Sequence, residues 1–245
     1  MWVWLDKLPP TSRCVGYWSQ KMAIEGLAER LAAVRARIQR AAERSRRDPA
    51  LIRLLAVTKI FPAEAIQAAY ALGLREFGEN YVQEFEGKAP LVRELAGARF
   101  HLIGHLQSNK AARAVELFQV VQTVDSAKLA RRLNQAAGGG LDVMLEVKLS
   151  QEESKHGVDP AGVPALIDAV RACPNLRLRG LMTMPPWSED PEAPRGCFRA
   201  LRELAEAHGL SELSMGMSND LETAIEEGST TVRVGTALFG RRRKD

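Results

Sequence analysis

The sequence predicts a single α/β domain built as a closed (β/α)₈ barrel. Eight short apolar segments alternate with stretches of helical periodicity, and such alternation indicates right-handed crossovers and a parallel sheet. The chain has 245 residues, of which 46% are hydrophobic and 26% charged, which suits one soluble domain of roughly barrel size. A doubly wound open sheet is the main rival. It is disfavoured because no Gly-x-Gly-x-x-Gly turn follows the first strand.

The first element expected is an amphipathic helix over 24–42, with apolar residues at helical spacing. The predicted strands that follow are 54–58, 76–77, 99–103, 119–124, 141–149, 176–182, 212–215 and 231–234. Helical patterns separate them, for example at 63–72, 81–95, 127–136, 163–172 and 194–208.

Residues 1–21 differ from the rest of the chain. They contain Trp2, Trp4 and Trp18, three of its four tryptophans, and they show no clear periodicity. We expect a disordered extension, or a start codon assigned upstream of Met22, and keep a docked functional arm as the alternative. The barrel domain is accordingly assigned to residues 22–245.

Charge and composition restrict the partners. The formal net charge is +4, but the basic residues of the first helix and of 241–244 have no interleaved aromatic residues. A solvated face explains them better than nucleic-acid binding. No segment reaches the roughly 18 apolar residues of a membrane span, and no signal peptide is evident. The odd cysteine count, without disulfide or metal spacing, suits the reducing cytoplasm.

Lys59 closes the first predicted strand. An ammonium at the end of a buried strand is costly unless it is paired or its pKa is lowered, and a lowered pKa makes the amine a nucleophile. The functional interpretation is a Schiff-base lysine that holds an aldehyde cofactor. The alternative is a strand-end lysine whose head reaches water.

Two small turns fall where barrels commonly bind phosphate, after strands seven and eight. The first contains Gly216 and Ser218 and leads into a helical stretch, and the second is Gly235-Thr236. Each alone is typical of a helix cap, whereas both together favour a bound phosphate. Arg233 alternates with two valines on the last strand, so it should face the barrel interior, either in an ion pair or toward a ligand.

Other polar residues also follow predicted strands, but they indicate no metal site. Asn80 follows the second strand, and Met182 ends the sixth. His101 lies inside the third strand and is interpreted as a hydrogen-bonded structural residue without an acid–base role. No His/Cys/Asp spacing resembles a metal centre, and no Walker or nucleophile-elbow motif occurs.

A family resemblance adds to this interpretation. The segments that carry it occur in order from about Ile24 to Gly240 and are LAVTK at 55–59, FGENYVQE at 77–84, HLIGHLQSNK at 101–110, SKHG at 154–157, GLM at 180–182, GMS at 216–218 and VRVGTALFG at 232–240. They closely resemble the YggS/PROSC family of pyridoxal phosphate homeostasis proteins. That family has the barrel of the alanine racemase N-terminal domain.

The resemblance implies that pyridoxal 5′-phosphate (PLP) is bound as a Schiff base on Lys59. It also implies that Ser218, Gly235 and Thr236 hold the phosphate, that Arg233 faces the pyridine nitrogen, and that Asn80 and Met182 line the pocket. Lys148 departs from the family, which often has asparagine there, and it adds a second amine near the barrel mouth.

The expected function is that of a monomeric cytoplasmic protein that stores PLP and releases it to apo PLP-dependent enzymes. The alternatives are a small PLP-dependent amino-acid racemase or lyase, and a generic sugar-phosphate barrel enzyme. Alanine racemase takes its second base, a tyrosine, from an added β domain and a partner subunit. Tyr81 is the tyrosine expected nearest the mouth here, and nothing in the sequence positions it as that base.

Overall fold

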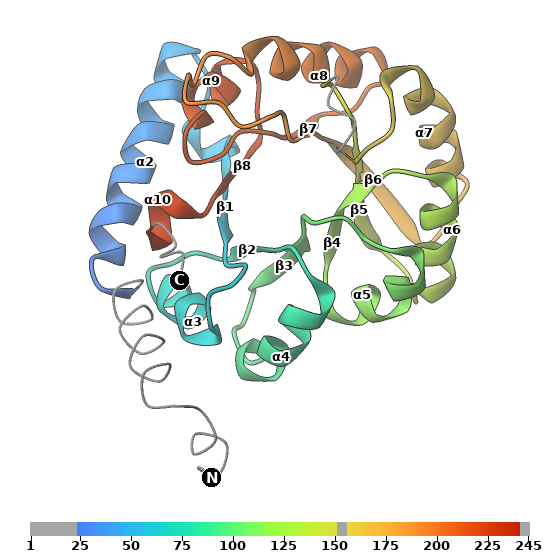
Figure 1. Ribbon diagram of the computed structural model, residues 1–245, viewed down its shortest axis with the longest axis horizontal. Coiled ribbons are helices and arrows are strands. Elements are labelled where there is room, and N and C mark those ends of the chain that lie inside the picture. Colours follow the sequence, from blue (N-terminus) through green and yellow to red (C-terminus); the bar gives the residue numbers. More distant parts are fainter. Residues whose placement is uncertain (1–23, 151–155, 241–245) are drawn as a thin grey trace.

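The computed structural model describes residues 24–150 and 156–240, so the first 21 residues and Met22 lie outside its description. Eight parallel strands close into a barrel in the order β1 to β8, with the helices around it (Figure 1). The strands are β1 Arg53–Val57, β2 Glu76–Glu79, β3 Arg99–Leu102, β4 Val120–Val124, β5 Leu141–Glu146, β6 Leu176–Met182, β7 Glu212–Ser214 and β8 Thr231–Val234. The predicted barrel is confirmed.

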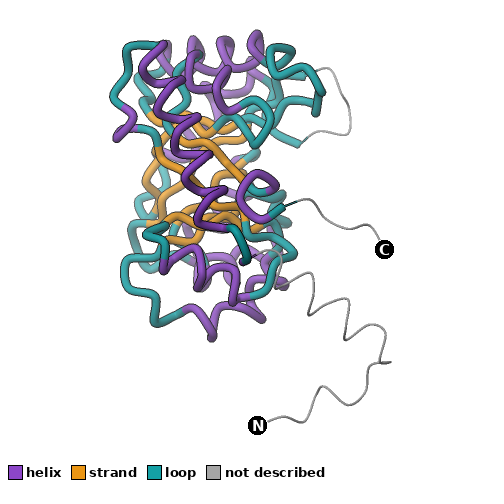
Figure 2. The backbone as a smooth tube through the Cα atoms, turned by 90° about the vertical axis from the view of Figure 1, so that its left-hand side faces the viewer, coloured by secondary structure: helices purple, strands orange, loops and turns teal. Residues whose placement is uncertain are grey.

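The helices form a layer outside the strands (Figure 2). They are α2 Leu27–Arg44, α3 Ala63–Ala71, α4 Val82–Val92, α5 Ala111–Leu117, α6 Ala127–Ala136, α7 Val163–Arg171, α8 Arg195–Ala207, α9 Leu221–Glu226 and α10 Thr236–Phe239, with short 3₁₀ turns η2 Pro49–Leu51, η3 Ser108–Lys110 and η4 Pro160–Gly162. Helix α5 is an addition to the helices named from the sequence. Within the described ranges, no helix is both long and apolar enough to cross a membrane.

The predicted strand bounds differ most at β2 and β5. Strand β2 continues to Glu79 because Gly78 pairs with His101 of β3. Strand β5 ends at Glu146 rather than at Leu149, since the chain beyond it pairs with the segment that precedes η4. Val147 bridges to Val158, and the Lys148 N–H donates to the Val158 carbonyl at 2.9 Å.

The main apolar core lies between the strands and the helices, and the barrel interior is partly polar. Val232 and Val234 pack in the outer core. Arg233, between them, is 4% exposed and bonds inside the barrel to Ser214 of β7 and to the Thr183 carbonyl just after β6. The alternation predicted for β8 is therefore confirmed.

Helix α2 packs against the end of the chain that carries the two phosphate-turn candidates, and it lies beside α9 and α10 in Figure 1. Arg37 pairs with Glu222 at 2.6 Å, and Arg44 pairs with Glu226 at 2.8 Å. Arg44 remains exposed, as expected for a solvated basic face, whereas Arg37 is partly buried against α9. The facing helix α9 supplies carboxylates to both arginines, which the local sequence does not reveal.

Candidate functional site

Two pockets of interest lie at the carboxyl ends of the strands, where barrel active sites are built. The larger has a volume of about 300 Å³. It is lined by residues that follow several strands, and they include six of the seven predicted site residues, namely Lys59, Asn80, Ser218, Arg233, Gly235 and Thr236. The closed parallel barrel brings these residues together because it places the carboxyl ends of all its strands on one rim.

Met182 is the exception among the predicted residues. It is 0% exposed at the end of β6 and is not among the residues that line this pocket. Met184 lines the pocket instead, and so does Trp187 from the loop after β6, which is 71% exposed. A tryptophan shortly after a predicted strand end is visible in the sequence and is the signal that could have identified Trp187 as a pocket residue.

Lys59 lies in the turn directly after β1 and is partly buried. The next residue, Ile60, has a φ of 64°, which is unfavourable for a β-branched side chain. Its N–H donates a hydrogen bond to the Glu84 carboxylate. A side chain of α4 thus helps to hold the turn that presents Lys59.

The same turn rests on a buried charged cluster. The Thr58 hydroxyl donates to Glu79 at 2.7 Å, and Lys88 contacts Glu79 at 3.0 Å and Glu84 at 2.7 Å. Burial raises the pKa of Glu79 to about 7, against the opposing effects of Lys88 and Thr58. Lys88 was not predicted from the sequence as part of the site, although its i,i+4 spacing from Glu84 is visible there.

The loop after β7 requires glycine at position 216. Gly216 has a φ of 92°, and a Cβ there would lie 2.4 Å from the Cβ of Ala224. Two residues on, the Ser218 hydroxyl accepts a hydrogen bond of 3.2 Å from the Ala237 N–H. This bond joins the two turns that the sequence singled out. Arg37 of α2 also donates to the Ser218 carbonyl at 2.9 Å.

Arg233 supplies a fixed cation at the pocket. Its Nη1 donates to the Ser214 hydroxyl and its Nη2 to the Thr183 carbonyl, each at 2.8 Å. Burial lowers the pKa of Arg233 to about 10, while nearby Asp220 and Glu146 oppose the shift. The guanidinium therefore stays charged at neutral pH. Asp220, which also lines the pocket, was not predicted, and burial raises its pKa.

Asn80 is positioned by a close backbone contact with the end of β3. A Cβ on Gly104 would lie 2.2 Å from the Asn80 carbonyl oxygen. Glycine at position 104 is therefore needed for the loops after β2 and β3 to approach.

Lys148 lies beside this pocket rather than in it. It lines an adjoining hollow of about 200 Å³, together with His105, His156 and Glu146. The two hollows share Ile103 and Met184. The second amine is thus near the barrel mouth, as predicted. Tyr81 is 59% exposed and lines neither hollow.

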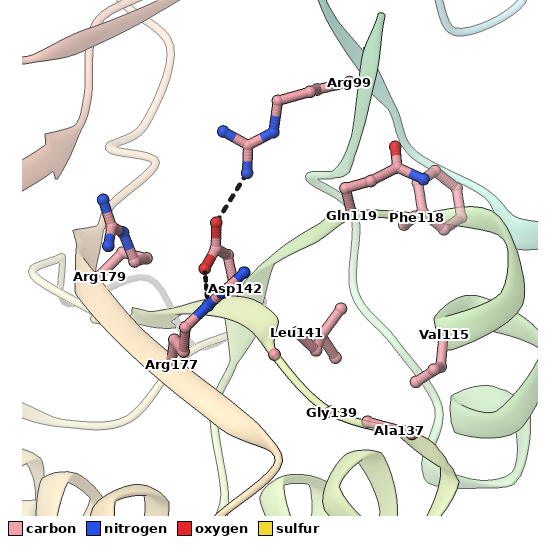
Figure 3. Close-up of a pocket in the computed structure, with 12 residues that line it drawn as sticks. Arg99, Val115, Phe118, Gln119, Ala137, Gly139, Leu141, Asp142, Arg177 and Arg179 are labelled. Atoms are coloured by element: carbon pink, nitrogen blue, oxygen red, sulfur yellow. Dashed lines mark hydrogen bonds and ion pairs between the residues drawn. The ribbon is translucent and has the colours of Figure 1, made fainter. Parts of the chain in front are cut away.

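A further hollow of about 690 Å³ lies at the other end of the barrel. Figure 3 shows the residues that line it. Its arginines are engaged with carboxylates. Arg99 and Arg177 pair with Asp142 at 2.7 and 2.8 Å, and Arg179 pairs with Glu212 at 2.8 Å. We interpret it as a structural ion-pair surface, because the strand carboxyl ends and Lys59 lie elsewhere. The described part of the chain contains no group of three or more His, Cys, Asp or Glu residues suited to a metal.

Comparison with known proteins agrees with this geometry. The family described as alanine racemase, N-terminal domain, matches residues 30–243. A protein of Pseudomonas aeruginosa named pyridoxal phosphate homeostasis protein is 50% identical over 221 residues, covering 88% of this chain and 96% of that protein. The chain belongs to the family of pyridoxal phosphate homeostasis proteins.

Further relatives place the chain within this family over nearly its full length. The homeostasis protein of Escherichia coli is 44% identical over 230 residues, covering 88% of this chain and 97% of its own. The solved structure of PipY from Synechococcus elongatus, with PLP bound, has a TM-score of 0.78 at 39% identity, covering 87% of this chain and all of that one. Alanine racemase of Corynebacterium glutamicum, at 19% identity and a TM-score of 0.65, shares the fold. The match covers 89% of this chain and 61% of the racemase chain.

Proposed function

We propose that this chain binds PLP in the 300 Å³ pocket, holds it as a Schiff base on Lys59, and releases it to other proteins. One observation carries the proposal. An amine, a buried guanidinium and the Ser218 hydroxyl converge on one pocket at the carboxyl end of the barrel. Relatives named for PLP homeostasis, and the PLP-bound structure of PipY, support it.

The residues present fit the chemical groups of this cofactor. Lys59 would condense with the aldehyde, forming the C=N bond and releasing water, which requires the neutral amine. Ser218, Gly235 and Thr236 would bind the phosphate, since a hydroxyl and backbone amides are good donors to it. Asn80 and Met184 would contact the cofactor at the pocket wall. Met182 is fully buried at the end of β6, and the expectation that it lines the cofactor site stays a prediction.

Arg233 would face the ring nitrogen. A guanidinium that remains charged can only donate a hydrogen bond, so the ring nitrogen would stay unprotonated. An unprotonated ring withdraws electrons weakly, which favours storage over chemistry at the substrate α-carbon. We therefore propose a carrier without turnover of amino acids, rather than a racemase or lyase.

The pocket also lacks a good second base among its described residues. Its titratable side chains are Lys59, Asp220 and Arg233. Asp220 accepts a hydrogen bond of 2.5 Å from the Met217 N–H within its own loop. Release would then proceed by an entering amine adding to the C=N carbon while the Lys59 amine leaves. Delivery to apo PLP-dependent enzymes, by a monomer in the cytoplasm, belongs to the same proposal.

Borohydride labelling tests the link. Purified protein incubated with PLP should absorb in the visible, and reduction should fix one pyridoxyl group on Lys59. Lys148, in the adjoining hollow, is the matched competitor, so Lys59→Ala and Lys148→Ala are labelled in parallel. Peptide mapping should find the adduct in Lys148→Ala and lose it in Lys59→Ala. An adduct on Lys148 in the unaltered protein would contradict the assignment.

A further inference from the structure

A continuous chain of hydrogen bonds crosses the barrel interior from Arg233 to Glu76. Arg233 Nη1 lies 2.8 Å from Ser214 Oγ, and Ser214 Oγ lies 2.6 Å from Gln122 Oε1. Gln122 Nε2 lies 2.9 Å from His101 Nδ1, and His101 Nε2 lies 2.5 Å from Glu76 Oε2. The three central residues, Ser214, Gln122 and His101, are at most 1% exposed. Glu76, by contrast, lines an open hollow near the start of β1.

The members come from opposite sides of the barrel. Arg233 and Ser214 lie on β8 and β7, whereas Gln122 and His101 lie on β4 and β3. In the ring of strands, β5 and β6 separate β4 from β7 on one side, and β8, β1, β2 and β3 separate them on the other (Figure 1). The contact between Ser214 and Gln122 therefore spans the interior, where a polar side chain is costly to bury without a partner.

The chemistry of the groups gives the chain one direction. A guanidinium has no acceptor, so Arg233 donates to Ser214, and the one hydroxyl proton of Ser214 goes to Gln122 Oε1. The Gln122 amide then donates to His101 Nδ1. This leaves the His101 proton on Nε2, where it is donated to the Glu76 carboxylate.

The protonation of His101 agrees with that direction. Burial lowers the pKa of His101, with Arg99 and Arg53 acting in the same sense and Glu76 opposing. A neutral ring with one proton on Nε2 is the form that the chain requires. Every link then donates from the cationic end toward the anionic end, and bonds so aligned polarise one another.

We propose that Ser214, Gln122 and His101 are positioning residues that hold Arg233 in the orientation needed to donate to the ring nitrogen of the cofactor. The inference rests on the proposed function, in which Arg233 faces that nitrogen. Two N–H donors of Arg233 are fixed, one by the Ser214 hydroxyl and one by the Thr183 carbonyl. The guanidinium plane is therefore held against rotation. This gives His101 a role through hydrogen bonding and no role in proton transfer.

The discriminating probe is a PLP analogue in which C–H replaces the ring nitrogen. The unaltered protein should prefer PLP over the analogue, because the analogue cannot accept from Arg233. Ser214→Ala and Gln122→Met break the chain at successive links. Each should reduce that preference about tenfold, the size of one charge-assisted hydrogen bond.

Ser229→Ala is the matched control. Ser229 is also fully buried, and its hydroxyl bonds at 2.8 Å to the Met215 carbonyl and at 3.0 Å to the Thr231 carbonyl. The Ser229→Ala variant loses comparable hydrogen bonds but leaves the hydrogen-bond chain from Arg233 to Glu76 intact. Its preference for PLP over the analogue should therefore match that of the unaltered protein. An equal loss in Ser229→Ala would reduce the effect to general destabilisation and would overturn the inference.

A second measurement does not depend on variants or cofactor. Nitrogen NMR of ¹⁵N-histidine-labelled protein should find His101 neutral at pH 7, with its proton on Nε2. A proton on Nδ1, or a doubly protonated ring, would reverse the chain and overturn the inference.

The inference and the proposed function can fail separately. If the unaltered protein is labelled on Lys59 but binds PLP and the C–H analogue equally, the inference fails and the proposed function stands. If Lys59 is not labelled, the proposed function fails, and the inference fails with it.

Discussion

The Nζ atom of Lys88 donates a hydrogen bond of 3.0 Å to the carbonyl oxygen of Thr58, the residue that precedes Lys59. Lys88 lies on α4 and is 8% exposed. A buried cation from a neighbouring helix thus fixes the backbone from which the proposed Schiff-base lysine projects. The position of Lys59 therefore depends on a second lysine that does not line the pocket.

Lys88→Met should destabilise the protein by about 3 kcal/mol, because it leaves the fully buried Glu79 carboxylate without its ion-pair partner. Urea unfolding measures the change. Arg93→Met is the control, since its ion pair with Glu94 is exposed on both sides, and it should cost less than about 0.5 kcal/mol. Similar losses in the two variants would contradict the importance of the buried cluster.

The pKa of Glu79 predicts how stability depends on pH. Burial raises it from an ordinary value of 4.5 to about 7, so the folded protein binds more protons than the unfolded chain between these values. The contribution of Glu79 to the free energy of unfolding is therefore highest at acid pH and is lost as pH rises from 4.5 to 7.

Glu79→Gln removes this titration. Relative to the unaltered protein, the variant should gain free energy of unfolding across that window, on the order of 3 kcal/mol, with no further relative change above pH 7. Urea unfolding at half-unit pH steps measures the difference. A difference that is constant from pH 4.5 to 7 would mean that folding does not raise the pKa of Glu79.

Ser218→Ala should weaken PLP binding about ten- to a hundredfold, by the loss of one hydrogen bond to a charged acceptor. Pyridoxal, which lacks the phosphate, should bind almost unchanged. Equilibrium titration of both aldehydes measures this. Ser126→Ala, which removes a hydroxyl that caps α6 outside the pocket, should alter neither affinity. Equal weakening for both aldehydes would show that Ser218 does not bind the phosphate.

The carrier proposal predicts that amino acids do not lose their α-proton. L-Alanine or L-serine should perturb the visible spectrum of the PLP-loaded protein, because exchange at the C=N carbon needs only Lys59 and an entering amine. Proton NMR in deuterated buffer should find the α-proton retained. Exchange that scales with protein concentration and disappears in Lys59→Ala would establish an enzyme instead.

The sequence alone determined the barrel and the ends of most strands, because apolar periodicity and strand-end glycines are local signals. The sequence also predicted that Lys59, Arg233 and the turns at Ser218 and Gly235 share one rim of the barrel. Closing eight parallel strands places all their carboxyl ends on the same side. The strand bounds at 76–77 and 141–149 were wrong, because pairing with β3 and with Val158 decides where those strands end.

Only the tertiary structure decided which side chains meet across the barrel or between helices. Arg37 and Glu222 are 185 residues apart in sequence, and Ser214 and Gln122 are 92 apart, so no local period connects them. The same holds for Met184 rather than Met182 at the pocket, where the path of the loop after β6 selects the side chain. A hydrogen bond between distant polar groups forms only when donor and acceptor are placed to within a few tenths of an ångström. The closed fold sets those positions, and the order of residues in the sequence does not.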